Sequence, residues 1–158
     1  MEKKIGVMFV CTGNICRSPM AEAVFQSLID EEGISEYFIV ASSGITDYHV
    51  GERPHQGTRK ILREKKIFLN PDKRALFLKR RDYDQYDYIV GMDEGNLRSL
   101  KWHGNKAKLL MAYAPEDMEY GLEVPDPYYS GGFDQVFELV YGGCKGLLKQ
   151  IRLDCDIP

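Results

Sequence analysis

Apolar residues along this chain gather in four short runs that are separated by longer segments of mixed character. The runs are rich in β-branched and aromatic residues, which favour strands over helices at such short lengths. They span residues 5–10, 37–41, 86–90 and 107–110. We therefore predict four strands at these positions.

The segments between these runs show helical spacing of apolar residues. Residues 20–29 place five of them on one face, and Gly33 can end that helix. Further helices are predicted over residues 55–66, 93–100 and 133–151, although three glycines in the last cost about 1 kcal/mol each relative to alanine. Strands that alternate with helices predict an α/β fold. We expect residues 1–158 to form a single domain, with a four-stranded parallel sheet and helices on both faces.

Composition narrows the classes of partner. The chain has 158 residues, 44% of them hydrophobic, and a net charge of −3. This balance gives no reason to expect nucleic acid or an anionic membrane as a partner. The first apolar run is too short for a signal peptide, and no run approaches the ~20 residues of a membrane-spanning helix. We expect a cytoplasmic protein whose four cysteines are free thiols and which needs neither metal nor cofactor.

The loop after the first predicted strand carries the candidate chemistry. Residues 11–19 read Cys-Thr-Gly-Asn-Ile-Cys-Arg-Ser-Pro and run from that strand directly into a helix. Such a loop can turn successive backbone N–H groups toward an anion, and the helix N-terminus adds partial positive charge. Gly13 and Asn14 tolerate the left-handed backbone of a tight loop, while Ser18 and Pro19 suit a helix start. We predict a phosphate loop between the first strand and the first helix.

Two side chains of this loop suit attack on a phosphate ester. Cys11 would lie at the base of the loop, where the N–H groups and Arg17 favour its nucleophilic thiolate form. The planar guanidinium of Arg17 matches two phosphate oxygens. A cysteine at a strand end can also be a small packing residue, so residue types alone leave both interpretations open.

The chain resembles the low-molecular-weight protein tyrosine phosphatases. The stretch Phe9 to Ala23 is similar to the opening signature of that family almost residue for residue. The likeness continues at Ser43-Gly44, Met92-Asp93-Glu94, Asn96-Leu97 and Asp126-Pro127-Tyr128-Tyr129. It implies hydrolysis of phosphotyrosine proteins and aryl phosphate monoesters through a phosphocysteine. We also expect a monomer, with inorganic phosphate as product and inhibitor. The implied phosphate-binding residues are Thr12, Gly13, Asn14, Ile15, Cys16 and Ser18.

The resemblance assigns the general acid to Asp126. A proton must reach the leaving oxygen, and the prolines on both sides of Asp126 restrict the local chain direction. The same tripeptide is also common in surface turns, and this remains the alternative interpretation.

Three tyrosines are expected to form the walls of the pocket. Tyr48, Tyr128 and Tyr129 could clamp an aromatic ring and favour phosphotyrosine over shorter phosphoserine. Many relatives carry Trp in place of Tyr48, so the substrate preference stays open. The resemblance also implies supporting roles for Ser43 and Asp93.

Two rival functions and one regulatory hypothesis remain. A thioredoxin-coupled arsenate reductase would need two mid-chain cysteines, and none lies between Arg17 and Gly143. An inactive phosphotyrosine-binding module would lack the nucleophile or the acid. Cys16 lies five residues from Cys11 and could trap an oxidised Cys11 as a disulfide.

Overall fold

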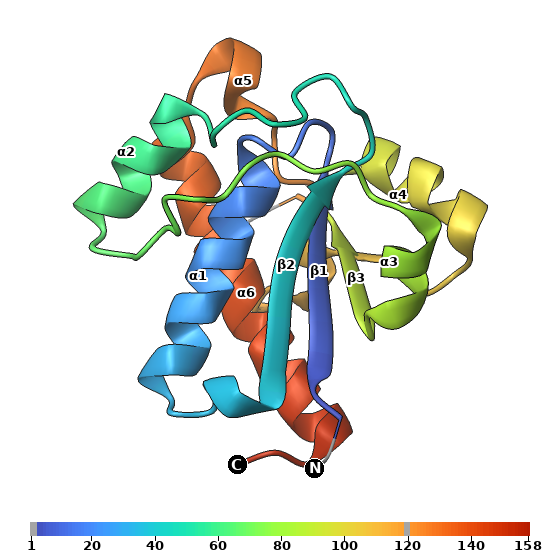
Figure 1. Cartoon of the computed structure of the whole chain (residues 1–158). Helices are drawn as coiled ribbons and strands as arrows, with labels where there is room; N and C mark the ends of the chain where they lie inside the picture. The colour runs from blue at the N-terminus through green and yellow to red at the C-terminus, as the bar shows by residue number, and fades with distance from the viewer. Residues whose placement is uncertain (1–2, 119–120) are drawn as a thin grey trace.

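Four parallel strands form one sheet at the centre of the computed structural model, which describes residues 3–118 and 121–158 (Figure 1). The strand order is β2-β1-β3-β4, and each neighbouring pair is parallel. This confirms the predicted sheet, although the last strand is shorter than its apolar run. The strands are β1 (Ile5–Cys11), β2 (Phe38–Gly44), β3 (Tyr88–Gly91) and β4 (Lys108–Leu109).

The predicted helices are present, and the structure adds short ones between them. The α-helices are α1 (Arg17–Glu31), α2 (Gln56–Glu64), α3 (Arg80–Gln85), α4 (Glu94–Leu100), α5 (Pro127–Ser130) and α6 (Phe133–Cys155). Among the described residues, the 3-10 helices are η1 (Ser35–Tyr37), η2 (Lys101–His103) and η3 (Leu110–Tyr113). Too few turns form in α3 and α5 to produce a helical period in the sequence. Within the described ranges, no helix has both the length and the apolar character needed to cross a bilayer.

Both faces of the sheet are covered, as the alternation of apolar residues along β1 requires. Val7 and Phe9 belong to a buried cluster with residues of α1 and α6, whereas Met8 and Val10 pack with Tyr83 of α3 and Leu100 of α4. Successive side chains of a strand point to opposite faces, so one buried strand supplies both cores. Figure 1 shows α1 and α6 on one side of the sheet and α3 and α4 on the other.

The glycines of α6 have a packing reason that outweighs their low helix propensity. A Cβ atom on Gly146 would overlap the main-chain carbonyl of Tyr113, and one on Gly143 would lie 2.6 Å from the side chain of Leu110. Without Cβ atoms, α6 can approach η3 closely enough to bury Leu110 completely. Helix propensity is a weak preference that such packing overrides.

The carboxyl end of β1 is the natural place for a ligand in this sheet. The chain leaves β1 through α1 to reach β2, and later returns on the opposite side of β1 as β3. Strand order therefore reverses direction at β1. In open α/β sheets, ligands bind beyond the carboxyl ends of strands at such a reversal.

We predict that Gly146→Ala destabilises the protein although alanine favours helix. The added methyl group must displace a backbone carbonyl, at a cost of about 1–3 kcal/mol of unfolding free energy. Gly142→Ala is the matched control, because there the methyl group meets only the flexible end of the Met118 side chain. Urea unfolding measures both variants. Equal stability of the two would contradict the packing argument.

Candidate active site

The loop after β1 is a curved segment whose own N–H groups are available to a ligand. Cys11 is the last residue of β1 and its side chain is buried. The Ile45 N–H donates to the Cys11 carbonyl at 3.0 Å, and the His55 N–H donates to the Ile15 carbonyl at 2.7 Å. Asn14 has a φ of 58°, in the left-handed region. The N–H groups of residues 13–16 find no acceptor in the part of the chain that the structure describes. Such free, closely spaced donors form an anion nest.

Arg17 is a buried cation held by groups from three segments. One guanidinium nitrogen donates to Asp93 Oδ2 at 2.6 Å and to the Val124 carbonyl at 2.9 Å, and the other lies 3.5 Å from Asp126 Oδ2. Burial opposes its charge, but Cys11, Asp93 and Asp126 together raise the pKa of Arg17 above its usual range. The guanidinium is therefore fixed as well as charged.

The Nε–H group of Arg17 is buried and has no partner among the described residues. A buried donor without an acceptor costs about 1–3 kcal/mol, so native proteins rarely keep one without a reason. An anion bound at the loop would supply the missing acceptor.

A series of hydrogen-bonded hydroxyl and amide groups contacts the Cys11 thiol. The Ser18 Oγ atom lies 3.0 Å from the Cys11 sulfur, and it accepts a hydrogen bond from Asn14 Nδ2 at 2.7 Å. Because α1 begins at Arg17, Ser18 lies inside the helix and does not cap it. Asn14 Nδ2 also donates to Ser42 Oγ at 3.0 Å. Ser43 reaches the network through its carbonyl oxygen, 3.5 Å from Ser18 Oγ, while its hydroxyl points to Met8.

This series of hydrogen bonds ends in a partly buried ion pair that sequence reasoning missed. Ser42 Oγ donates to Glu22 Oε1 at 2.6 Å, and Lys73 Nζ lies 3.7 Å from the same oxygen. Lys73 also donates to the Ser42 carbonyl at 3.0 Å. Burial lowers the pKa of Lys73, while Glu22 and Cys11 act in the opposite direction. Lys73 thus ends the hydrogen-bonded series that starts at the Cys11 thiol. Its position in an irregular segment between α2 and α3 gave no signal in the sequence.

Asp126 and Asp93 each cap a helix and face Arg17. Asp126 Oδ1 accepts the Tyr128 N–H at 3.1 Å at the start of α5, leaving Oδ2 toward the guanidinium. Asp93 Oδ1 likewise accepts the Asn96 N–H at 2.8 Å at the start of α4. Asp93 thus caps the helix predicted over residues 93–100 and also contacts Arg17.

Cys11, Arg17 and Asp126 meet in one small cavity of about 110 Å³. Tyr128 packs edge-on against Tyr129, with ring centroids 4.8 Å apart, and lies 5.5 Å from His49. Tyr48 and Tyr129 are 76% and 87% exposed, so they form the rim of the cavity and its base lies deeper. Gly13 leaves room for the His49 ring, which a Cβ atom there would approach to 2.7 Å. The lining residues are Cys11, Thr12, Gly13, Ile15, Cys16, Arg17, Tyr48, His49, Asp126, Tyr128 and Tyr129.

The four cysteines differ sharply in their surroundings. All are free, and Cys11 and Cys16 line the same cavity. Burial, then Cys11 and Asp126, raise the pKa of Cys16 to about 12, so its thiol is protonated at neutral pH. Cys144 is fully buried in α6 and its thiol contacts the Ala21 carbonyl, while Cys155 lies exposed at the end of that helix. Neither lines the cavity, so no pair of cysteines is placed to relay a disulfide from Cys11.

Thr12 lines the cavity, and Asn96 contacts it from outside the lining. Thr12 Oγ1 accepts hydrogen bonds from Arg17 at 3.4 Å and from Asn96 Nδ2 at 3.3 Å. Asn96 was noted in the sequence only within a short motif, without a role. Within residues 3–118 and 121–158, no three ionisable or thiol side chains converge in a way that could hold a metal ion.

We predict that Lys73→Met slows alkylation of Cys11 by iodoacetamide at neutral pH several-fold, because an ammonium group that favours the thiolate is lost. The partly buried Glu22 carboxylate would also lose its cation, so the melting temperature should fall. Peptide-resolved mass spectrometry follows Cys11, and thermal unfolding follows stability. Lys101→Met, at an exposed position, is the control. An unchanged alkylation rate in Lys73→Met would contradict this role.

Comparison with known proteins agrees with this geometry. The family model described as "Low molecular weight phosphotyrosine protein phosphatase" matches residues 6–156. The protein-tyrosine-phosphatase YfkJ of Bacillus subtilis is 42% identical over 153 residues, which cover 94% of this chain and 96% of that one. Its crystal structure superposes with a TM-score of 0.91 at 40% identity, covering 98% of each chain.

More distant relatives share the same architecture. The low molecular weight phosphotyrosine protein phosphatase of Sus scrofa is 39% identical over 157 residues, covering 92% of this chain and 95% of its own. The crystal structure of an arginine phosphatase from Drosophila has a TM-score of 0.84 at 27% identity, covering 92% of this chain and 97% of that one. Matched over nearly its whole length, and with a cysteine and an arginine set around one anion nest, this chain belongs to the low molecular weight phosphotyrosine protein phosphatase family.

Proposed function

We propose that the protein hydrolyses phosphotyrosine through a phosphocysteine intermediate on Cys11. The observation that carries this is a buried thiol, an orphaned guanidinium N–H and a carboxylate around one cavity with an aromatic rim. In the first step, the Cys11 thiolate attacks phosphorus and the bond to the phenol oxygen breaks. Asp126 in its acid form gives its proton to that oxygen, so the leaving group departs as neutral tyrosine.

In the second step, water attacks the phosphocysteine. The Asp126 carboxylate accepts a proton from the water as the sulfur–phosphorus bond breaks. Cys11 leaves as a thiolate, stabilised by the Ser18 hydroxyl at 3.0 Å, and inorganic phosphate remains in the cavity. The product occupies the anion nest and so inhibits the enzyme.

The phosphate oxygens are bound by main chain and by Arg17. We assign the N–H groups of residues 13–16 and the Arg17 Nε–H to the three non-bridging oxygens. Hydrogen-bond donors that are already in position stabilise the negative charge that develops in the transition state without a cost of rearrangement. Thr12 and Ser18 orient Arg17 and Cys11, while Asn14 and Asp93 hold the loop and the guanidinium.

The rim favours a flat aromatic ester. Tyr48, Tyr128 and Tyr129 offer ring faces and edges to a phenyl group, and the buried Ile15 adds an apolar contact. Because two structural relatives are arginine phosphatases, phosphoarginine is the second candidate substrate. A guanidinium group needs acceptors for its N–H groups. Of the lining side chains near the mouth, Asp126 is the carboxylate that could serve, and the mechanism already uses it.

We propose the cytoplasm as location, since all four cysteines are free. The proposal also treats residues 1–158 as one phosphatase domain acting as a monomer on phosphoproteins and small aryl phosphates.

We predict that Cys11→Ser abolishes turnover of phosphotyrosine peptides and para-nitrophenyl phosphate, while phosphate still raises the melting temperature. Full activity of this variant would exclude Cys11 as nucleophile. Turnover of phosphoarginine above that of phosphotyrosine by the unaltered protein would reverse the choice of substrate.

Asp126→Asn should lower kcat about 10²- to 10⁴-fold, the usual contribution of general acid catalysis. The loss should grow as the leaving phenol becomes more basic, because such a phenol depends more on the donated proton. A series of substituted phenyl phosphates measures this slope. Glu36→Gln, an exposed carboxylate in η1, is the control that should change neither value. A loss that is independent of the leaving group would remove Asp126 from the acid role.

We further predict reversible inactivation by hydrogen peroxide. The Cys11 thiolate is oxidised to a sulfenic acid as peroxide is reduced to water, and the Cys16 thiol then forms the disulfide with loss of a second water. The high pKa of Cys16 keeps it from reacting first. Dithiothreitol should restore activity in the unaltered protein and fail in Cys16→Ser after prolonged oxidation. Full recovery of the Cys16→Ser variant would refute the pairing.

A further inference from the structure

Helix α2 and its flanks carry an excess of positive charge beside the active-site rim. Residues 52–66 contain six lysines and arginines against two glutamates, although the whole chain has a net charge of −3. Arg59, Lys60 and Arg63 lie on the outer turns of α2. We call these three residues the basic face of α2.

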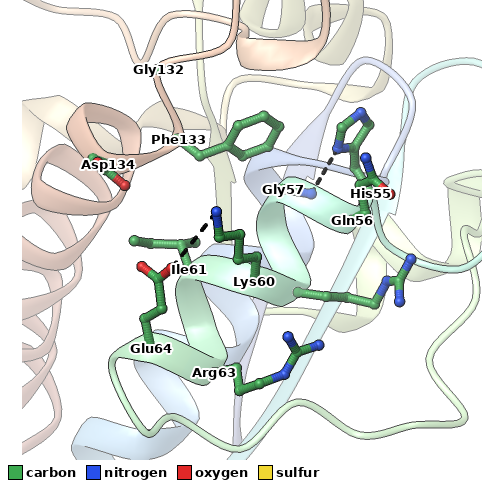
Figure 2. A pocket seen from close by; sticks show the side chains of 11 residues that line it. His55, Gln56, Gly57, Lys60, Ile61, Arg63, Glu64, Gly132, Phe133 and Asp134 are labelled. Carbon is green, nitrogen blue, oxygen red and sulfur yellow. Dashed lines mark hydrogen bonds and ion pairs between the residues drawn. The ribbon is translucent and has the colours of Figure 1, made fainter.

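Two hollows lie along this face. The larger, of about 780 Å³, opens between α2 and the start of α6 and is lined by all three residues of the basic face (Figure 2). The smaller, of about 280 Å³, lies on the other side of α2 and is lined by Arg53, Arg59 and Arg63. Arg59 and Arg63 line both hollows. No carboxylate lines the smaller one among the residues that the structure describes.

Acidic side chains balance only part of this charge. Glu64 and Asp134 also line the larger hollow, and Glu64 lies 4.0 Å from Lys60. In Figure 2, Lys60 extends between Phe133 and Glu64, and Arg63 extends from the side of α2 that faces away from Phe133. Arg59 donates through Nε to the Pro54 carbonyl, which holds its stem without neutralising it. Neither Arg59 nor Arg63 forms an ion pair within residues 3–118 and 121–158.

A continuous row of rings connects the larger hollow with the active-site cavity. Tyr128, at the rim, lies edge-on to His55 with ring centroids 5.9 Å apart, and His55 stacks on Phe133 at 5.0 Å. His55 and Phe133 both line the hollow, as Figure 2 shows. Gly57 makes this arrangement possible, because a Cβ atom there would overlap the Phe133 ring. A peptide that leaves the rim can therefore follow an unbroken surface onto α2.

We propose that the basic face of α2 binds acidic side chains of the substrate protein, a few residues from the phosphotyrosine. This inference rests on the proposed function, since a phosphotyrosine bound in the cavity fixes the position of the peptide on the protein. The two ring-to-ring steps correspond to about three residues of extended chain, at roughly 3.3–3.6 Å each. Charge complementarity selects the partner, because the uncompensated groups on this face are arginines.

The size of the expected preference for acidic peptides follows from the exposure of the charged side chains. Ion pairs between exposed side chains change affinity about 1.5- to 5-fold each at moderate ionic strength. Two such pairs should favour an acidic peptide about tenfold over a neutral one. Because exposed charges are screened over about 8 Å at physiological salt, the preference should shrink as salt is added.

Matched phosphotyrosine peptides test this surface. One carries glutamates two to four residues from the phosphotyrosine on its N-terminal side, one carries them on its C-terminal side, and one has glutamines instead. We expect one acidic peptide to exceed the neutral peptide about tenfold in kcat/KM at 20 mM salt, and Arg59→Glu with Arg63→Glu to remove this advantage. The double variant should keep its kcat/KM on para-nitrophenyl phosphate and on the neutral peptide.

Arg81→Glu with Lys101→Glu makes the same charge change on exposed residues of α3 and η2, across the sheet, and should preserve the preference. Lys60→Gln with Arg63→Gln is a milder variant for which we expect a partial loss, in case the reversal of Arg59 disturbs the loop at Pro54. Equal turnover of the three peptides, or an equal loss in the α3 and η2 control, would overturn the proposal.

A binding measurement separates this proposal from the proposed function. Fluorescence anisotropy of the labelled acidic phosphopeptide with Cys11→Ser needs no turnover. Arg59→Glu and Arg63→Glu in that background should weaken binding about tenfold at low salt. If para-nitrophenyl phosphate and all peptides resist hydrolysis, the proposed function fails, and this measurement still decides the docking surface. Unchanged binding, or tighter binding to phosphatidylserine vesicles than to the peptide, would refute acidic-peptide docking.

Discussion

The buried guanidinium of Arg17 is the constraint on which the rest of the site depends. It connects the loop after β1, the start of α4 and the segment before α5, through Thr12, Asp93 and the Val124 carbonyl. A buried charge is tolerated only when paired and hydrogen-bonded, and removing one partner typically costs about 3–5 kcal/mol. These segments are far apart in sequence, so Arg17 stabilises the fold and assembles the site with the same contacts. Its Nε–H has no partner among the described residues, and we propose that it binds the substrate phosphate.

Besides Arg17, a fixed hydrogen-bonded network contacts the Cys11 thiol. Ser18, Asn14 and Ser42 form a hydrogen-bonded series that ends at Glu22 and Lys73, so each polar group near Cys11 is itself held in place. The rim has the opposite character, with highly exposed tyrosines on short or irregular segments. The cavity therefore combines a fixed base with a mouth whose side chains are free to adapt.

Much of the fold and the core of the site could be predicted from the sequence. Buried strands give continuous apolar runs, and the segment from Cys11 to Pro19 combines a strand end, residues that suit a tight turn and a helix start. Short helices such as α3 and α5 were missed because their length hides periodicity. Ser42 and Lys73 were missed for another reason: neighbouring strand residues point to opposite faces, and a lysine in an irregular segment carries no signal of burial. The contacts of these two residues depend on tertiary packing, which no local pattern encodes.

The N–H groups of residues 13–16 have a consequence for how such a protein can change over evolutionary time. Every residue other than proline supplies the same donor, so substitutions in this segment that keep its curvature leave the anion nest intact. The rim is built from side chains, which a single codon change can replace. Affinity for phosphate and choice of leaving group can thus diverge independently. One scaffold can in this way give rise to phosphatases with different substrates, as the shared architecture of tyrosine and arginine phosphatases illustrates.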